Sequence, residues 1–294
     1  MPEGHTLHRL ARDLQAAFAG RLVRVGSPQG RFADAAALLD GQVVDGAESW
    51  GKHLFIAFPD ERLVHVHLGL YGGFEVHADI DGGVAEVPPP VGQVRLRLVT
   101  ADAGDTSYAD LRGATACELV TVQQRDAILA RTGPDPIRAG QDPGQDPGQD
   151  PGRVWERIRS SRAPIGGLLM DQSVLAGVGN VYRAEVLFRQ RIHPLRPGNT
   201  LRVGQWQAMW DDLVELMAEG VRTGRIDTVR PEHTPEAMGR PPRVDDHGGE
   251  VYVYRRTGRS CHVCGATVRT GVLQARNIFW CPRCQPAFRS RAVR

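Results

Sequence analysis

The sequence contains very little lysine. Of its 36 basic residues, 35 are arginine and only one, Lys52, is lysine. A bias in the base composition of the coding DNA explains the arginine excess, but it does not explain the one lysine that is kept. An ammonium group is compact and can release its proton, whereas a guanidinium group stays charged. Lys52 is therefore either a chance survivor or a residue that transfers protons in a reaction.

Long apolar runs and a secretory leader are also missing. No apolar run reaches the roughly 18 residues that a membrane-spanning helix needs. The start, Met-Pro-Glu-Gly-His, has no basic segment followed by an apolar one. With 41% hydrophobic and 24% charged residues, the composition excludes global disorder, collagen and coiled coils. We expect a cytoplasmic protein that does not bind membranes, and the length of 294 residues predicts two domains.

Cysteine is scarce until the C-terminal end of the chain. Cys117 stands alone and is interpreted as a small core residue. The other four form the pattern Cys-x2-Cys-x16-Cys-x2-Cys: Cys261, Cys264, Cys281 and Cys284. Two close pairs at this separation are typical of a structural Zn²⁺ site on two knuckles, and nothing indicates the oxidising compartment that disulfides require. We expect one structural Zn²⁺, with His262 as an alternative ligand.

The small net charge of +2 conceals a division between the two halves. Residues 1–150 hold 13 basic and 21 acidic side chains, which gives −8, whereas residues 151–294 hold 23 basic and 13 acidic ones, which gives +10. A cationic half indicates a polyanionic partner, most simply nucleic acid. The alternative is a solvated surface on which the charges happen to segregate.

Hydrophobic periodicity divides the chain in the same place. A helical stripe follows Pro2 and ends near Gly20. A period of two then predicts short strands at residues 21–25, 43–47, 54–58, 63–68, 74–77, 94–99 and 116–122, which indicates a β-sandwich. Residues 140–152 repeat Gln-Asp-Pro-Gly and are interpreted as a linker.

The second half is predicted to be helical, with a hairpin at its end. Helical patterns lie at residues 154–159, 166–172, 181–189 and 205–221. We expect a mobile loop at residues 223–250, because Pro, Gly and charged residues are frequent there. Segments 251–255 and 268–280 are expected to frame the zinc knuckles as a β-hairpin, with Arg276 near its turn. The fold class predicted from these patterns is α+β with several domains.

Three places have residues that suit chemistry on nucleic acid. Gly177 and Gly179 permit a tight turn before a helix that Asn180 opens, so backbone N–H groups and the Asn amide are available to a phosphate. Arg276 on a hairpin tip is placed to clamp phosphates. Once Met1 is removed, Pro2 is a secondary amine with a pKa of about 7.7–8.0, and Glu3 stands beside it to transfer protons. Each has a plain alternative: a capped turn, an exposed arginine, and a helix start whose acid complements the dipole.

Five motifs follow one another along the chain: Pro2-Glu3-Gly4; Trp50-Gly51-Lys52-His53; residues 131–136, Arg-Thr-Gly-Pro-Asp-Pro; residues 170–182 with Gly-Val-Gly-Asn-Val-Tyr at their end; and the four-cysteine finger with Arg276. Together they resemble the formamidopyrimidine-DNA glycosylase / endonuclease VIII family of base-excision repair enzymes. The Pro-Glu-Gly start and residues 70–72, Leu-Tyr-Gly, are most like an actinobacterial endonuclease VIII.

The resemblance implies a bifunctional DNA glycosylase / AP lyase that removes oxidised pyrimidines from double-stranded DNA and nicks the strand by β,δ-elimination. Pro2 would form the Schiff base with the sugar, and Glu3 would transfer protons. Lys52 would contact the lesion strand and donate a proton during β-elimination. Arg276 would hold the phosphates beside the flipped nucleotide and assist δ-elimination.

The resemblance also implies DNA contacts. Asn180 and Arg131 would bind the DNA, and Leu70 and Tyr71 would fill the gap that a flipped base leaves. The alternative for Leu70 and Tyr71 is a place in the core at a strand edge. The partner would be damaged DNA, bound by a monomer in the bacterial cytoplasm at the nucleoid.

The implied architecture has a catalytic N-terminal helix and β-sandwich at residues 1–130 and a linker at residues 131–152. A helix–two-turn–helix domain at residues 153–250 and the zinc-finger hairpin with its tail at residues 251–294 follow.

Two departures from the family pattern and two other functions remain open. Family members commonly have Pro-Glu where this chain has His5 and Thr6, and endonuclease VIII commonly has Gln in place of Gly69. The first alternative function is a glycosylase directed at 8-oxoguanine and formamidopyrimidine. The second is a zinc-finger protein that binds DNA without catalysis.

Overall fold

The computed structural model describes residues 2–80, 83–101, 105–139, 150–244 and 249–289. The chain divides into two compact units, residues 1–131 and 132–294, and each is described by itself. Most of the Gln-Asp-Pro-Gly repeat, residues 140–149, lies outside the described residues. The end of the repeat is helical, because Pro151 opens a helix that Asp150 caps by accepting a hydrogen bond from the Gly152 N–H at 2.7 Å.

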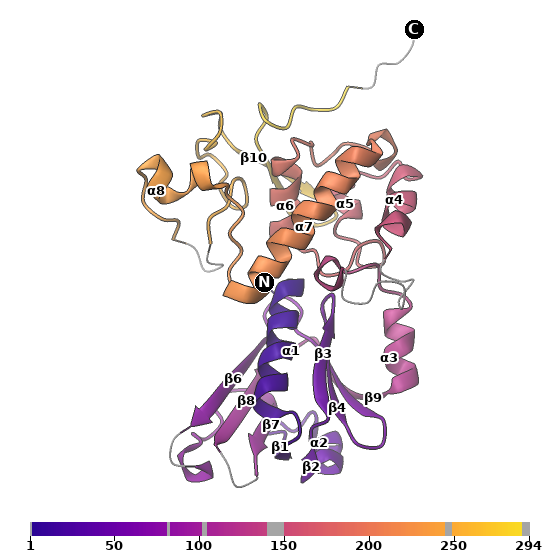
Figure 1. The fold of residues 1–294 in the computed structure, drawn as a ribbon, viewed down its shortest axis with the longest axis vertical. Helices are drawn as coiled ribbons and strands as arrows, with labels where there is room; N and C mark the ends of the chain where they lie inside the picture. Colours follow the sequence, from indigo (N-terminus) through magenta and orange to yellow (C-terminus); the bar gives the residue numbers. More distant parts are fainter. Residues whose placement is uncertain (1, 81–82, 102–104, 140–149, 245–248, 290–294) are drawn as a thin grey trace. The chain divides into compact units, whose positions relative to one another are not determined.

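The first unit contains two antiparallel sheets (Figure 1). One sheet has the order β2-β1-β7-β8-β6 and the other the order β3-β4-β5-β9. Their strands are β1 (Leu22–Gly26), β2 (Gln42–Val43), β3 (Gly46–Trp50), β4 (His53–Phe58), β5 (Arg62–His67), β6 (Gly73–Ile80), β7 (Val94–Thr100), β8 (Thr106–Arg112) and β9 (Ala116–Thr121). The predicted β-sandwich is confirmed.

Helix α1 (Gly4–Phe18) lies against edge strands of both sheets. It packs on β3, which is an edge of the four-stranded sheet, and on β6, which is an edge of the five-stranded sheet. Leu7, Leu14 and Phe18 on one side of the helix are at most 1% exposed and belong to the sandwich core. The helical stripe in the sequence therefore covers two strand edges that would otherwise present unpaired backbone groups.

Four described elements of this unit were not predicted: β8, α2 (Ala33–Leu39), η1 (Val84–Glu86) and α3 (Val122–Leu129). Strand β8 carries Asp110, which is buried at 3% exposed and lies 3.5 Å from Arg97 and 3.0 Å from Arg112. Because a buried charge pair breaks the apolar alternation, the pattern there does not predict a strand. The predicted strand at residues 43–47 is wrong, since β2 ends at Val43 and β3 begins at Gly46.

The second unit is mainly helical and has its own core. Its helices are η2 (Pro136–Arg138), α4 (Pro151–Arg159), α5 (Ile165–Leu168), α6 (Asn180–Arg189), η4 (Gly198–Thr200), α7 (Val203–Thr223), η5 (Pro231–His233) and α8 (Pro235–Met238). Tyr182 on α6 and Met209 and Leu213 on α7 are fully buried in this core. Two of the helices, η5 and α8, lie in the segment that we expected to be a loop.

The hairpin lies between the two cysteine pairs. Strands β10 (Arg269–Leu273) and β11 (Arg276–Trp280) pair antiparallel, and Gln274 and Ala275 form their turn with φ of 50° and 58°. The predicted strand at residues 251–255 is wrong. The N–H groups of Tyr252, Val253 and Tyr254 donate instead to the Glu185 carboxylate on α6, at 2.6–2.9 Å. A side chain therefore takes the place of a partner strand, which alternating apolar residues cannot indicate.

Candidate active site

Pro2 and Glu3 lie immediately before helix α1. Pro2 is half-buried, and Glu3 is the N-cap residue and is 0% exposed. The Glu3 carboxylate makes no capping hydrogen bond, while its backbone carbonyl accepts from the Thr6 N–H at 3.0 Å. Helix capping therefore does not explain why a carboxylate is buried at this position. If Met1 is removed, this buried carboxylate lies one residue from an imino group, which is an arrangement suited to proton transfer.

His5 is the first residue that departs from the family pattern, and it is buried. It is 6% exposed, and burial, followed by the charge of His8, lowers its pKa to about 4. The Thr6 hydroxyl lies 3.4 Å from His5 Nε2. A neutral imidazole and a hydroxyl thus occupy the place of the family's proline and carboxylate.

Lys52 lies in the tight turn between β3 and β4. Gly51 precedes it with φ of 58°, which favours glycine, and Trp50 and His53 form the last pair of the ladder. The Lys52 side chain is half-buried. Its ammonium group is close enough to His67 to contribute, after burial, to a lowered pKa of that imidazole. Strand register therefore holds the only lysine of the chain beside a histidine.

A hydrogen-bonded chain of side chains continues from this turn into the sheet. His53 Nδ1 lies 3.0 Å from His65 Nε2, and His65 Nδ1 lies 2.9 Å from Glu118 Oε1. His53 also packs against His67, with ring centroids 5.4 Å apart. Burial, and then the charges of His65 and His67, lower the pKa of His53 to about 4. His53 therefore stays neutral near pH 7.

Sequence analysis did not identify this histidine network. Its signal is the spacing of His65 and His67, which puts both on one face of β5, and the pairing of His65 with Glu118 on β9. His53 was noted only as a neighbour of Lys52. The pairing joins residues 53 positions apart in the sequence, so it depends on the sheet topology.

Leu70 and Tyr71 form an exposed tip on a tight turn after β5. Leu70 is 46% and Tyr71 91% exposed, so the alternative of a core position is wrong. The Gly69 N–H donates to His67 Nδ1 at 3.1 Å, and the Gly72 N–H to the Leu68 carbonyl at 3.1 Å. A fixed turn that presents a leucine and a tyrosine to solvent is suited to insertion between stacked bases.

Gly69 is the second departure from the family pattern, and the backbone conformation of the turn requires a glycine there. Its φ is 69°, and a Cβ added there would lie 1.9 Å from Thr115 Oγ1. A glutamine does not fit this turn while Thr115 keeps its position.

Arg131 ends the first unit and is exposed. Its Nε donates to the Ala127 carbonyl at 3.1 Å, and its charge contributes to the lowered pKa of His53. It therefore lies close enough to His53 for their charges to interact.

In the second unit, two of the sequence motifs build a single turn. Gln172 accepts from the Gly177 N–H at 3.0 Å and donates to the Val178 carbonyl at 3.0 Å. Gly133 approaches the same region so closely that a Cβ would meet the Val174 carbonyl carbon at 2.5 Å. The turn delivers Asn180 to the first position of α6. Asn180 is 8% exposed and opens a ten-residue helix, whose N-terminus favours anions.

Arg183 links Asn180 to the hairpin strand that carries Arg276. This buried guanidinium donates to Asn180 Oδ1 and, at 2.9 Å, to the Asn277 carbonyl. The bond fixes the Asn180 amide so that its NH₂ group points away from Arg183. Arg276 is the first residue of β11 and is exposed beside the turn, as predicted. Sequence analysis did not identify Arg183, because an arginine in an arginine-rich chain gives no signal of its own.

The four cysteines of the C-terminal pattern form one cluster. Their sulfurs all lie within 4.8 Å of one another. The Sγ atoms of Cys261 and Cys284 are 3.9 Å apart and those of Cys264 and Cys281 3.4 Å, so neither pair is a disulfide. Thiolates that hold Zn²⁺ tetrahedrally at about 2.3 Å are about 3.8 Å apart. The cluster therefore fits a tetrahedral metal ion.

Comparison with known proteins identifies the family. Residues 1–117 match the formamidopyrimidine-DNA glycosylase N-terminal domain, and residues 139–231 match the formamidopyrimidine-DNA glycosylase H2TH domain. The chain belongs to the formamidopyrimidine-DNA glycosylase family. The resemblance inferred from the five motifs is confirmed, and so is the fold class, with its β-sandwich, helical domain and cysteine cluster at zinc-finger spacing.

Within this family, the relatives carry the name of its endonuclease VIII branch. The chain is 51% identical over 285 residues to Endonuclease 8 1 of Mycobacterium tuberculosis, covering 97% of this chain and all of the relative. It is 31% identical to Endonuclease 8 of Pectobacterium atrosepticum over the same share of each chain. Among solved structures, Lactococcus lactis Fpg in complex with abasic-site DNA is 26% identical, with a TM-score of 0.74 over 97% of this chain and all of that one.

No helix among the described residues has the length and apolar character needed to cross a membrane.

Proposed function

We propose that this protein is a bifunctional DNA glycosylase / AP lyase of base excision repair that acts on oxidised pyrimidines. Its curated relatives named above are endonucleases VIII, and its family is one of DNA glycosylases with AP lyase activity. The observation that carries the proposal is Glu3. It is fully buried beside Pro2, and its carboxylate does not cap the helix that it precedes.

The first step uses Pro2 and Glu3. After removal of Met1, the neutral Pro2 nitrogen attacks C1′ of the damaged nucleotide, and the C1′–base bond breaks. Glu3 supplies a proton as the base leaves and the sugar ring opens. The product is an iminium that joins the Pro2 nitrogen to C1′. Because an α-amine titrates at about pH 7.7–8.0, an appreciable fraction of it is nucleophilic near neutral pH.

The later steps cut the strand. The iminium makes the C2′ proton acidic, and loss of this proton expels the 3′ phosphate by β-elimination. Lys52 contacts the lesion strand and donates a proton in this step, and the histidine network fixes the turn that carries it. A second elimination expels the 5′ phosphate, with Arg276 holding the flanking phosphates. Water finally releases the sugar fragment and regenerates the Pro2 amine.

The remaining residues would bind DNA and hold the finger together. Asn180 binds a phosphate at the start of α6, Arg131 contacts the DNA, and Leu70 and Tyr71 fill the space of the flipped base. Cys261, Cys264, Cys281 and Cys284 would hold one structural Zn²⁺, which would stabilise the fold of the finger.

The test is covalent trapping. The zinc-loaded protein with an authentic Pro2 terminus is incubated with duplex DNA that contains an oxidised pyrimidine, and borohydride is added. We expect a reduced protein–DNA adduct in the wild type and none in Pro2→Thr, with unchanged zinc content. Arg222→Ala, on an exposed part of α7, is the control and traps like the wild type. An adduct that survives Pro2→Thr contradicts the role of Pro2.

Substrate choice needs its own experiment. A panel of duplexes with 5-hydroxycytosine, thymine glycol, 8-oxoguanine and formamidopyrimidine separates the proposed pyrimidine preference from the alternative glycosylase. Failure to nick any of them, or abasic-site DNA, supports a zinc-finger protein that binds DNA without catalysis.

A further inference from the structure

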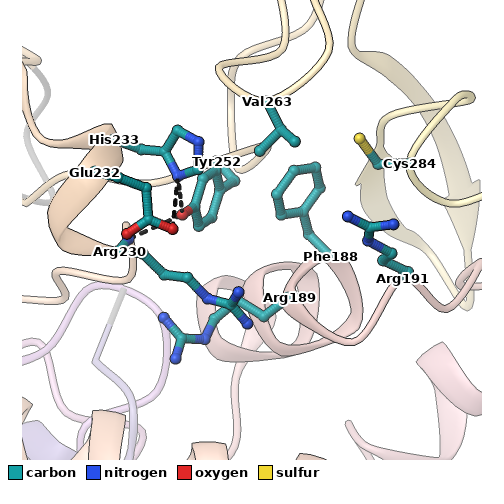
Figure 2. Close-up of a pocket in the computed structure, with 9 residues that line it drawn as sticks. All are labelled: Phe188, Arg189, Arg191, Arg230, Glu232, His233, Tyr252, Val263 and Cys284. Atoms are coloured by element: carbon teal, nitrogen blue, oxygen red, sulfur yellow. Dashed lines mark hydrogen bonds and ion pairs between the residues drawn. The ribbon is translucent and has the colours of Figure 1, made fainter. Parts of the chain in front are cut away.

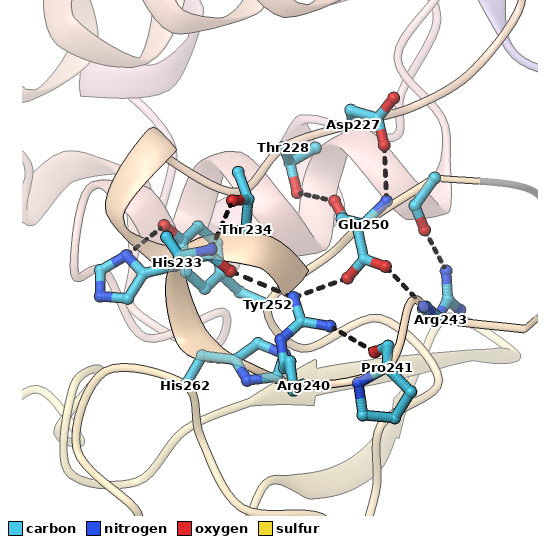
Figure 3. Close-up of polar contacts among 12 residues, drawn as sticks. Asp227, Thr228, His233, Thr234, Arg240, Pro241, Arg243, Glu250, Tyr252 and His262 are labelled. Carbon is cyan, nitrogen blue, oxygen red and sulfur yellow. Dashed lines mark hydrogen bonds and ion pairs between the residues drawn. The ribbon is translucent and has the colours of Figure 1, made fainter.

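A cationic pocket lies in the second unit, outside the residues to which we assign a function. Its volume is about 430 Å³, which is within the range of ligand sites. It is formed by the segments around residues 240–244 and 250–262. Figure 3 shows Arg240, Arg243, Glu250 and His262 from these segments. Among the residues that the structure describes, its charged lining consists of five guanidinium groups and one carboxylate: Arg240, Arg243, Arg255, Arg256, Arg259 and Glu250.

Glu250 organises one wall of the pocket. Its Oε1 accepts from the Arg243 N–H at 2.5 Å, its Oε2 lies 2.7 Å from an Arg240 guanidinium nitrogen, and its own N–H donates to Asp227 at 2.7 Å (Figure 3). Glu250 is 8% exposed. The single carboxylate of the lining is therefore already committed to Arg240 and to the backbone.

Arg256 is a buried cation held by neutral groups. It is 7% exposed, and its guanidinium donates to the Tyr252 carbonyl and, at 2.8 Å, to the Ser260 carbonyl. Within the described part of the chain, no carboxylate lies within ion-pair distance of it. A third guanidinium contact is with His262 Nδ1, at 3.4 Å. Burial lowers the pKa of Arg256, and the charge of Glu185 opposes this only in part, so an anion that enters the pocket would reduce the cost of burying the guanidinium.

Arg259 adds a second cation from the same turn. Its N–H donates to the Arg256 carbonyl at 3.0 Å, so the two side chains start from opposite ends of one turn. Arg256 is buried and Arg259 is exposed. Arg255, also exposed, packs over the Tyr254 ring at 5.5 Å. The pocket thus has one buried guanidinium group, of Arg256, and two exposed ones, of Arg255 and Arg259.

We propose that this pocket binds a phosphoryl group, with Arg256 at its base and Arg259 at its rim. A guanidinium presents parallel N–H donors that match phosphate oxygens, and the lining holds an excess of such donors. A volume of about 430 Å³ leaves room for a sugar attached to the phosphate. The phosphoryl group comes either from a DNA strand or from a free phosphate or mononucleotide. The inference does not depend on the proposed lesion chemistry.

The experiment is calorimetric titration of the zinc-loaded full chain with inorganic phosphate. We expect Arg259→Ala to weaken phosphate binding about fivefold or more, and Arg259→Lys to weaken it less, because charge is kept and the paired donors are lost. Removal of Arg259 breaks no side-chain hydrogen bond among the described residues, so the variant should fold, and zinc content verifies this. Arg222→Ala removes an exposed charge elsewhere and should bind like the wild type.

A second titration distinguishes the sources of the phosphoryl group. Inorganic phosphate is added to protein saturated with undamaged duplex. A DNA phosphate occupies the pocket if two results are obtained together. DNA must block the binding of inorganic phosphate, and Arg259→Ala must reduce by about one the slope of the logarithm of the duplex-binding constant against the logarithm of the salt concentration. If phosphate binds unchanged, the pocket serves a free phosphate or nucleotide. The proposal is overturned if the wild type binds no phosphate and the salt slope is unchanged, or if Arg259→Ala binds phosphate like the wild type.

Discussion

His65 and Glu118 occupy directly paired positions on β5 and β9, and His65 Nδ1 lies 2.9 Å from Glu118 Oε1. The carboxylate fixes one ring nitrogen of His65 and leaves the other, 3.0 Å from His53, to complete the network. The Glu118 side chain is 56% exposed, whereas that of His65 is 6% exposed. The network therefore connects solvent at β9 to the turn that carries Lys52.

The first prediction concerns acid stability. The pKa of His53 is about 4 in the fold and about 6.5 in an unfolded chain, so the unfolded state binds more protons between these values. Above pH 6.5 both states are neutral and His53 has no effect. As the pH falls from 6.5 to 4, stability is lost, by up to about 3 kcal/mol from this residue. Urea unfolding at pH 7.5 and pH 5 measures the loss, and His53→Asn should reduce it.

The control for acid stability is His77→Asn. His77 is an exposed histidine on β6 that stacks on Tyr108, apart from the network. It should keep the full pH dependence of the wild type. Equal pH dependence in His53→Asn and the wild type contradicts the assignment.

The second prediction concerns Gly69. Gly69→Ala should lower the free energy of unfolding by about 2 kcal/mol or more, because φ is 69° and the new Cβ meets Thr115. Gly73→Ala is the matched control, since a Cβ there has nothing within 4 Å. Denaturant unfolding of both variants is the measurement. If both variants lose the same free energy of unfolding, the turn accommodates a Cβ at position 69 and the prediction is contradicted.

The third prediction separates stability from function at the exposed tip. Tyr71 is 91% exposed, so Tyr71→Ala should change the free energy of unfolding by no more than about 0.5 kcal/mol. Nicking of lesion-containing duplex should fall at least tenfold, whereas nicking of the same lesion in single-stranded DNA should change little, because no gap in a duplex needs to be filled. Val91→Ala, at 71% exposed, is the control. Equal loss on both substrates contradicts a wedge role.

The fourth prediction concerns the cysteine cluster. We expect one zinc per purified chain, measured by plasma mass spectrometry, and loss of most of it in Cys264→Ser. Cys117→Ser is the control, because Cys117 lies in the first unit, apart from the cluster, and this variant should keep its metal. Full zinc occupancy in Cys264→Ser would exclude Cys264 as a ligand.

Local patterns in the sequence predict much of the fold. The strands with regular alternation, the amphipathic helix α1 and the cysteine spacing all depend on residues close together in the chain. Strand β8 was not predicted because it contains a buried charge, Asp110, which pairs with Arg97 on the neighbouring strand β7 and with Arg112 at the end of β8 itself. The segment at residues 251–255 has the alternation of a strand, but Glu185 binds its N–H groups.

The same distinction applies to the functional residues. Unusual residue types at fixed positions, such as Pro2 and the single Lys52, can be identified from the sequence. The histidine network and the Arg183 contact with Asn277 depend on residues far apart in the sequence, and the arginine pocket depends on how residues 240–244 and 250–262 pack together. Figure 2 illustrates this for a smaller cavity of about 160 Å³, where Arg189, Arg230 and Tyr252 come together from separate segments. No local motif brings such residues together.

Glu185 couples two parts of the second unit, so one substitution at this position would affect both. Its two oxygens accept from the N–H groups of Tyr252, Val253 and Tyr254 and from the Thr228 hydroxyl. Glu185 lies on helix α6, which begins with Asn180. The segment that Glu185 binds, residues 252–254, leads into the cysteine finger. A change at position 185 that leaves every proposed contact residue intact would disturb the helix and the finger together. Such a variant would weaken the two proposed DNA contacts at Asn180 and Arg276 together, although Glu185 itself is 0% exposed.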